Sequence, residues 1–188
     1  MEKYLILARH SLPEVVESLP AREWRLSKEG RARSKRLAER LRSYHPEAVV
    51  SSTEPKAMET AEIVANDLEL PLQSVNGLHE HDRSKTAYLS RDGFQSAVRE
   101  FFEKPDTLVF GSETADQTYA RFSAAVHSIL DQYREKSIVI IAHGTVISLF
   151  VSRLTGVSGL SLWRELGLPS FMVIDRESNK LLTKENVI

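Results

Sequence analysis

The stretch that decides the fold of this chain is Ser-Ile-Val-Ile-Ile-Ala at residues 137–142, which runs directly into His143 and Gly144. It is a short, continuous apolar run rich in β-branched residues, and such runs are typical of strands buried on both faces of a parallel sheet. An apolar segment follows at once and predicts a helix over residues 145–154. A buried strand that passes through His-Gly into a helix indicates an α/β protein.

The same alternation of strand and helix extends from this stretch to both ends of the chain. We expect further strands at residues 4–8, 48–51 and 70–75, and a closing pair at 170–175 and 180–186. Helical spacing predicts helices at 28–43 (with Ser27 as N-cap), 55–68, 94–103 and 114–135. The pattern predicts a three-layer α/β/α sandwich around a mostly parallel central sheet. No linker interrupts it, so we expect a single domain over residues 1–188.

Composition excludes several classes of protein. The chain has 25 Lys and Arg against 26 Asp and Glu, a formal net charge of −1, which argues against a nucleic-acid-binding protein. It has no cysteine, which excludes disulfides, thiolate catalysis and Cys-ligated metals. No apolar run approaches the ~20 residues that span a bilayer. We therefore expect a cytoplasmic protein with neither a nucleic-acid nor a membrane partner, and its oligomeric state stays open.

Polar residues follow the predicted strands at the ends where α/β sheets bind their ligands. Arg9 and His10 follow the first strand, Ser51-Ser52 ends the second, and His143 follows the strand at 137–142. Because ligands bind outside the carboxyl ends of the strands, we expect the two histidines to meet in one crevice. Lys56 begins the next helix and can reach the same crevice. Cationic side chains and helix N-termini in one place favour an anion such as phosphate.

Attack of a histidine on a phosphate ester also requires an acid near the leaving group. A neutral imidazole can attack phosphorus if its other nitrogen is held protonated. The alcohol that leaves then needs a proton, so a carboxylic acid is expected close by. Glu80 is the best candidate, because it lies in the polar cluster at residues 79–83; Asp82 and Glu113 are the alternatives.

These residues resemble those of the histidine phosphatase superfamily, the group that includes the cofactor-dependent phosphoglycerate mutases. The family opens with a strand that ends in Arg-His-Gly, and Leu-Ile-Leu-Ala-Arg-His-Ser stands here at residues 5–11. The family's Leu-Ser/Thr-x-x-Gly step is matched at 26–30, its Ser-Ser-Pro-Leu-x-Arg-Ala-x-x-Thr-Ala segment at 51–61, its Leu-x-Glu step at 78–80, and its strand-His-Gly element at 140–144. The elements occur in the family's order and span residues 3–150, most of the chain.

The resemblance implies a phosphoglycerate mutase-like fold and a phosphohistidine mechanism. His10 would be phosphorylated, and Glu80 would act as acid and later as base for water. Arg9, Lys56 and His143 would grip the phosphate, with Ser11 and Gly144 completing the binding site. No metal and no organic cofactor are implied. We expect a metal-independent phosphatase that hydrolyses a small phosphomonoester.

Departures from the family pattern keep two other functions open. Ser11 replaces the family's first Gly, Lys56 replaces its second Arg and loses the bidentate fork, and Val16 falls where many members carry a phosphate-binding Asn. A catalytically weak member that binds phosphorylated ligands is therefore an alternative. Phosphoglycerate mutase activity is another, but the segment after Glu80 lacks the insertion expected of a glycolytic mutase, so we favour hydrolysis.

Two further clusters have simpler interpretations. Residues 79–82 read His-Glu-His-Asp and invite a zinc interpretation, but no further ligand pair accompanies them, so we expect no metal. The basic run of Arg31, Arg33, Lys35 and Arg36 could recruit an acidic partner, and a solvated helix face is the preferred interpretation. Substrate identity is expected to depend on residues 77–113 and on the N-terminal loop, where the sequence is least patterned.

Overall fold

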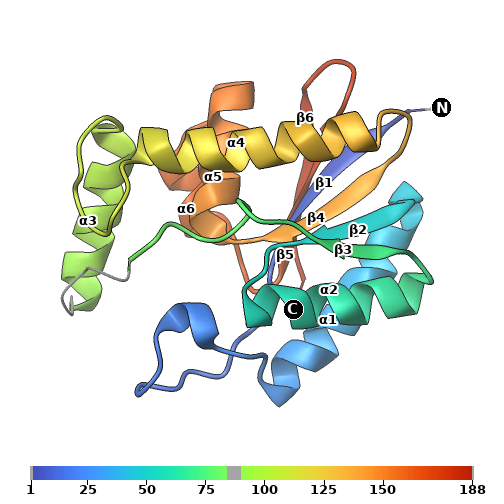
Figure 1. Cartoon of the computed structure of the whole chain (residues 1–188), viewed down its shortest axis with the longest axis horizontal. Coiled ribbons are helices and arrows are strands. Elements are labelled where there is room, and N and C mark those ends of the chain that lie inside the picture. Colours follow the sequence, from blue (N-terminus) through green and yellow to red (C-terminus); the bar gives the residue numbers. More distant parts are fainter. Residues whose placement is uncertain (1, 84–89, 188) are drawn as a thin grey trace.

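The central sheet is mixed, with most of its strands parallel (Figure 1). The computed structural model describes residues 2–83 and 90–187. Within these residues the strand order is β3-β2-β4-β1-β5-β6, where the strands are β1 (Tyr4–Arg9), β2 (Ala48–Ser51), β3 (Leu72–Ser74), β4 (Ile138–Ala142), β5 (Ser170–Asp175) and β6 (Leu181–Asn186). β1 to β4 pair in parallel, and β5 runs antiparallel to both of its neighbours. The predicted α/β class with a mostly parallel sheet is confirmed.

The helices largely follow the predicted ranges. They are α1 (Lys28–Leu41), α2 (Pro55–Leu68), α3 (Arg91–Glu103), α4 (Ala115–Gln132), α5 (Gly144–Thr155) and α6 (Gly159–Glu165), with short 3-10 turns η1 (Ala21–Glu23) and η2 (Arg42–Tyr44). α3 begins earlier than predicted because the Ser90 side chain caps it by accepting the Gly93 N–H. The predicted helices at 28–43 and 114–135 end at Leu41 and Gln132. α6 was not predicted, since seven residues are too few for helical periodicity to be recognised.

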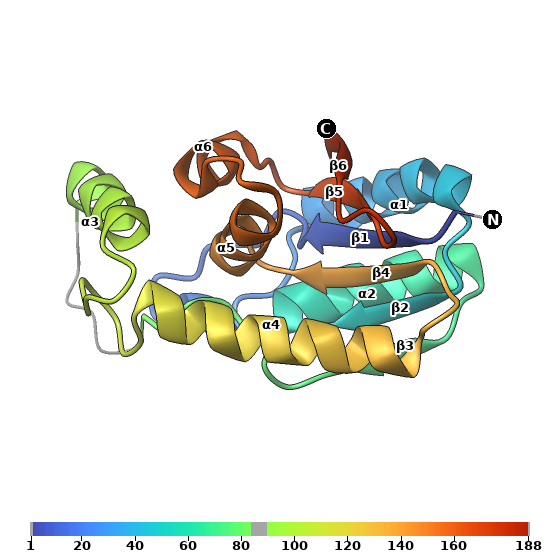
Figure 2. The same cartoon turned by 90° about the horizontal axis from the view of Figure 1, so that it is seen from above.

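Alternate residues of each strand enter separate cores on the two faces of the sheet. Leu5, Leu7 and Ile140 pack with α4 and α5 on one face, whereas Ile6 and Ile141 pack with α1 and α2 on the other. Figure 1 shows the sheet between these two helical layers, and Figure 2 views the molecule from the α4 side. The predicted core residues of α1 and α2 are buried: Leu26 just before α1, then Leu37, Leu41, Ala57, Ala61 and Val64. Three layers result, as predicted.

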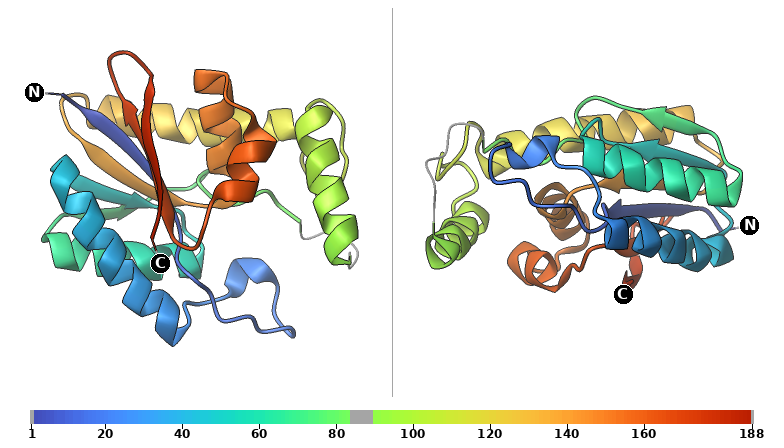
Figure 3. Two further views of the ribbon diagram at one scale, coloured as in Figure 1. Left: turned by 180° about the vertical axis from the view of Figure 1, so that it is seen from behind. Right: turned by 90° about the horizontal axis from the view of Figure 1, so that it is seen from below.

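A smaller apolar cluster lies beyond the sheet, where α3 packs near the start of α4 and against α6. Its buried members include Val98, Phe101 and Phe110. Phe102 and Trp163 are partly buried and pack against the same cluster. Figure 3 places α3 and the 11–26 segment at the same end of the molecule, where β1, β2 and β4 finish. Both elements are thus positioned to border a site at the strand ends.

The 11–26 segment is held to the start of α1 by close backbone contact. The Ser27 side chain caps α1 by accepting the Gly30 N–H, and its hydroxyl donates to the Leu12 carbonyl. A Cβ on Gly30 would lie 2.0 Å from the Leu12 oxygen, so only glycine permits this approach. The Leu-Ser-x-x-Gly motif therefore ties the loop after His10 to the first helix.

No helix in the described ranges combines the length and the apolar character needed to cross a membrane.

Candidate active site

Three strand ends bring the candidate histidines together. The Ala142 carbonyl accepts the His10 N–H at 2.9 Å, and the Ile141 carbonyl accepts the Ser52 N–H at 2.9 Å, so the backbone ladders of the sheet extend into the site. The ring centroids of His10 and His143 lie 5.1 Å apart. Two residues separated by 133 positions thus lie side by side because β1 and β4 are neighbours.

His10 is arranged so that one ring nitrogen is available. Its Nδ1 lies 2.8 Å from the Ser11 carbonyl, an acceptor, so Nδ1 carries the proton and donates. Nε2 then holds the lone pair. The ring is 6% exposed, and burial, together with His143, Lys56 and Arg9, holds the pKa of His10 well below its ordinary value. His10 is therefore neutral at physiological pH, as an attacking imidazole must be.

His143 lies deeper than His10. It is fully buried, and its Nε2 lies 2.9 Å from the Ser52 hydroxyl. Its Nδ1 is also buried and makes no hydrogen bond within the described residues. Burial lowers the pKa of His143 to about 3; Glu80 opposes the shift, and Lys56 and Arg9 reinforce it.

Arg9 brings a largely buried positive charge to the same place. Its Nη1 donates to the Leu166 carbonyl at 2.5 Å, just after α6, while its Nε is buried without a hydrogen bond among the described residues. A Cβ on Gly144 would lie 3.2 Å from that Nε, so the glycine at the start of α5 leaves room for the guanidinium. Burial lowers the pKa of Arg9, but a guanidinium stays charged in proteins.

Ser11 holds the loop rather than presenting a free hydroxyl. Its hydroxyl donates to the Gly30 carbonyl at 2.7 Å, and its N–H donates to Thr60 Oγ1 at 3.0 Å. The residue is fully buried. The expected contact of this hydroxyl with a ligand would require these internal hydrogen bonds to change.

Glu80 lies beside the start of α5. Its carboxylate accepts the His81 N–H at 2.9 Å and the Thr145 N–H at 3.2 Å, and Arg83 Nη2 lies 3.8 Å from it. Burial raises the pKa of Glu80, but Arg83, His143 and the two N–H donors outweigh burial and lower it to about 2. Without a ligand, Glu80 is a carboxylate.

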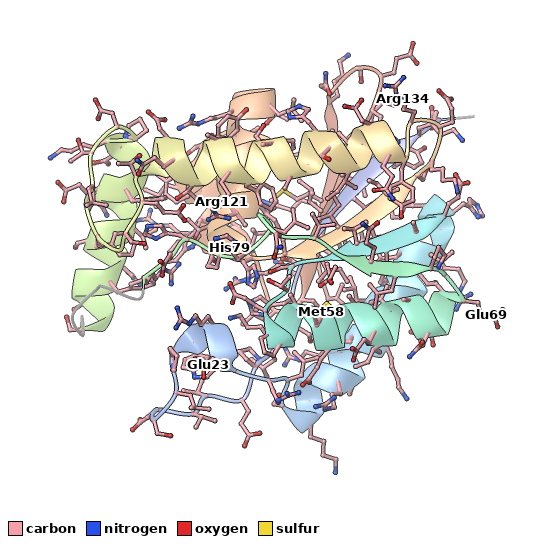
Figure 4. The ribbon with its side chains drawn as sticks, in the orientation of Figure 1. Glu23, Met58, Glu69, His79, Arg121 and Arg134 are labelled. Carbon is pink, nitrogen blue, oxygen red and sulfur yellow. The ribbon has the colours of Figure 1, made fainter. Side chains whose placement is uncertain are left out.

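Arg121 of α4 fixes the segment that carries Glu80. Its guanidinium donates to the carbonyls of Gly77, His79 and Glu80 at 2.8, 2.9 and 3.3 Å. Figure 4 shows Arg121 directed from α4 toward the chain segment at His79. The same guanidinium forms a forked pair with Glu113, at 2.5 and 3.2 Å. Glu113, an alternative acid, is thus held in a structural ion pair with Arg121.

Asp82, the other alternative acid, also accepts a hydrogen bond within the protein. Asp82 Oδ2 accepts the Ser112 hydroxyl at 2.6 Å, although Asp82 does border the cavity described below. Glu80 is the one of the three whose carboxylate reaches the backbone beside His143.

Lys56 reaches the site in the company of a residue that the sequence analysis did not single out. Lys56 Nζ lies 2.6 Å from Glu54 Oε2 and 2.7 Å from the Ala21 carbonyl. Glu54 Oε1 accepts the Glu80 N–H at 2.8 Å and lies 3.5 Å from His143 Nε2. A signal was present in the sequence, because Glu54 stands where the quoted family segment has leucine.

A cavity of about 880 Å³ opens beside this group of residues. One wall is the 17–22 stretch, and the opposite wall includes Phe94 and Phe110. Arg83 lies over these rings, 4.8 and 5.9 Å from their centroids. The remaining described lining residues are Thr53, Glu54, Lys56, His79, Glu80, His81 and Asp82. Residues 84–89, part of the 77–113 segment expected to read the substrate, lie outside the described residues.

The residues of the zinc interpretation do not converge. The His81 ring packs on Phe101 and Phe110, with centroids 4.4 and 4.7 Å away, and its Nε2 lies 3.1 Å from the Glu113 carbonyl. In residues 2–83 and 90–187, no three His, Asp or Glu side chains are grouped to hold a metal ion.

The basic run on α1 is largely paired on its own surface. Arg33 and Arg36 both bind Glu29, at 2.9 and 3.0 Å, and Arg31 binds Glu59 at 2.7 Å. Lys35 is exposed. These contacts are those of a solvated helix face.

Comparisons with known proteins place this geometry in a family. One curated relative, the uncharacterized phosphatase PhoE of Bacillus subtilis, is 24% identical over 131 residues, which cover 70% of this chain. The alignment spans 65% of that relative's own length. Among solved structures, YhfR of Bacillus stearothermophilus superposes with a TM-score of 0.77 at 21% identity, covering 99% of this chain and 98% of that one. A mycobacterial glucosyl-3-phosphoglycerate phosphatase superposes with a TM-score of 0.73 at 20% identity, covering 92% of this chain and 90% of that one.

Such structural likeness establishes the fold, and the sequence match goes further. The sequence model of the histidine phosphatase superfamily (branch 1) matches residues 5–185, nearly the whole chain. That range includes each strand end from which the histidine pocket is built. The chain with His10 and His143 side by side is thus a member of the histidine phosphatase superfamily.

Proposed function

We propose that this protein is a metal-independent phosphatase that hydrolyses a small phosphomonoester through a phosphohistidine on His10. The observation that carries the proposal is the state of His10: buried, neutral, and with Nδ1 bound to the Ser11 carbonyl, so that Nε2 is the nucleophilic nitrogen. Arg9 and His143 adjoin it.

In the first step, the His10 Nε2 lone pair forms a bond to phosphorus while the bond from phosphorus to the ester oxygen breaks. The phosphoryl group carries its charge on three oxygens, so catalysis depends on cations and donors placed around them. Arg9 supplies a buried charge that burial does not neutralise, and Lys56 supplies a second. The N-terminus of α5, at Gly144, adds a favourable dipole.

Glu80 is proposed to protonate the departing alkoxide. It is ionised in the empty site, with a pKa of about 2. A phosphate dianion beside it would raise this pKa, because like charges favour the protonated carboxyl. The acid form would therefore arise in the substrate complex, where the reaction requires it.

In the second step, water attacks phospho-His10 and inorganic phosphate leaves. Glu80, now a carboxylate, accepts the proton of that water, and the bond from phosphorus to Nε2 breaks to regenerate the free imidazole. The proton balance closes over the two steps. The cavity of about 880 Å³ exceeds the size of a phosphate alone and leaves room for an organic leaving group. A cytoplasmic location is part of the proposal.

The test is hydrolysis of p-nitrophenyl phosphate in EDTA by the wild type and by His10→Asn, with His45→Asn as the matched control. His45 is exposed and distant from the site, and its left-handed backbone conformation tolerates Asn. We expect turnover by the wild type and the control, and loss of nearly all activity in His10→Asn. An acid-labile phosphoenzyme should form only when His10 is present.

A wild type that is inert in EDTA from acidic to neutral pH, yet binds phosphate, would instead identify a phospho-ligand-binding member of the family. Conversion of 2- to 3-phosphoglycerate would identify a mutase, and we expect none.

A further inference from the structure

Glu54 occupies an unusual place for a carboxylate. It precedes α2 as N-cap, yet its side chain caps no N–H of that helix. Its oxygens lie 2.6 Å from Lys56 Nζ, 2.8 Å from the Glu80 N–H and 3.5 Å from His143 Nε2. The side chain is 10% exposed. These contacts direct the carboxylate into the candidate active site.

Two of these partners are groups proposed to bind the substrate phosphate. Lys56 therefore already holds an anion that belongs to the protein, and the same carboxylate lies 3.5 Å from His143 Nε2. Lys56 cannot turn its ammonium wholly toward a phosphate while Glu54 and the Ala21 carbonyl hold it.

Glu54 also lies between the cavity and the histidines. The described residues that line the cavity include Glu54, Lys56 and Glu80, whereas His10 and His143 are not among them. His143 is fully buried behind this layer, and His10 is 6% exposed. A phosphate entering from the cavity meets the Glu54 carboxylate before it reaches the imidazole.

We propose that Glu54 mimics the phosphate, competes with it for Lys56 and for the space beside His143, and is displaced when the substrate binds. This inference rests on the proposed function for the identity of the anion. Like charges placed together oppose binding, so an ionised Glu54 weakens the site for phosphate. The same competition assists the release of inorganic phosphate. This product lacks the organic group with which a substrate would also contact the cavity, so Glu54 displaces it more easily.

Glu54→Gln tests this inference because it keeps the shape and removes the charge. We expect inorganic phosphate to bind about tenfold more tightly or better, since a like charge is removed from the site. The KM for p-nitrophenyl phosphate should fall in parallel, with kcat changed by less than about threefold. Glu62→Gln is the matched control, because Glu62 is exposed on the same helix and should change neither value.

Calorimetric titration with inorganic phosphate provides a readout that does not depend on turnover. If neither wild type nor variant hydrolyses a phosphate ester but the variant binds phosphate more tightly, the proposed function fails and this inference stands. If Glu54→Gln unfolds, Glu54→Leu, with the family's residue, replaces it in both assays.

Three results would overturn the inference. The first is phosphate affinity that is unchanged, lost or weakened in a folded variant. The second is a kcat loss of about a hundredfold or more at constant KM, which would make Glu54 a proton donor. The third is weaker binding confined to phosphate esters that carry an amine, which would make it a recognition site for a substrate cation.

Discussion

The candidate site has two sides that are built differently. Arg9, His10 and His143, here the strand-end group, emerge from β1 and β4 and are positioned by the sheet itself. Glu54, Lys56 and Glu80, here the carboxylate wall, come from the segments that follow β2 and β3 and hold one another. In the proposed mechanism, the strand-end group would define where a phosphoryl group is attacked. The carboxylate wall would determine the charge and the proton supply that the reaction encounters.

This difference has a physical cause. A strand end inherits its position from backbone hydrogen bonds and from packing on both faces, which tolerate little displacement. A loop carboxylate is positioned by a few charged contacts, so it responds to the charge of a ligand. The proposed mechanism therefore combines a fixed nucleophile, His10, with an acid, Glu80, that can respond to the ligand.

The largest effect is expected from a change in the strand-end group. His143→Gln keeps a hydrogen-bonding group near the Ser52 hydroxyl but places it differently. It should therefore lower kcat by about 10²–10³, the usual cost of removing one donor from a charge-stabilising site. Steady-state kinetics with p-nitrophenyl phosphate measures it. His127→Gln is the control, since exposed His127 also contacts a serine, Ser123, but on α4 away from the pocket. A loss below about threefold would refute the role of His143.

A smaller effect is expected from the support of the carboxylate wall. Arg121→Lys keeps the charge but loses the fork that binds Glu113 and three carbonyls, so we expect kcat to fall by about tenfold. The unfolding free energy should fall by about 2 kcal/mol. Because Arg121 would act through Glu80, an alkyl phosphate, a poor leaving group, should lose more rate than p-nitrophenyl phosphate.

Arg134→Lys, just beyond the C-terminal end of α4 in Figure 4, is the matched control for Arg121. An equal loss for the alkyl and aryl esters would assign Arg121 a general structural role, independent of proton transfer.

An effect on stability alone, with every side chain of the site kept, is expected from acidification. Burial lowers the pKa of His143 to about 3, below that of an unfolded histidine, and Glu80 titrates near pH 2 in the folded state. For both groups the unfolded chain binds more protons in acid, so the unfolding free energy should decrease as pH falls. The decrease should begin near pH 6.5 for the histidines and add the Glu80 contribution below about 4.5.

Urea unfolding at several pH values between about 7.5 and 4 measures this decrease, which should amount to a few kcal/mol. His143→Gln cannot titrate and should flatten the slope. A stability that is constant or rises on acidification would contradict the neutral, buried state of the histidine pair.

Most of the fold could be predicted from sequence because its strands are continuous apolar runs. The apolar stretch before His143 and the apolar run before Arg9 predict buried strands without tertiary information. The two closing strands were predicted nearly to their ends. α6 could not be recognised from seven residues, although the Leu166 carbonyl just after it accepts a hydrogen bond from Arg9. Short elements lack the periodicity on which such predictions depend.

The sequence by itself determined the α/β class, the family and the presence of two histidines at strand ends, because strand periodicity and ordered motifs are local properties of the chain. Only the tertiary structure decided which charges meet. It paired Lys56 with Glu54, committed Glu113 to Arg121 and set Glu80 among donors that keep it ionised. These partners lie 2 to 65 positions apart, and their pairing depends on distances and burial that no spacing along the chain specifies.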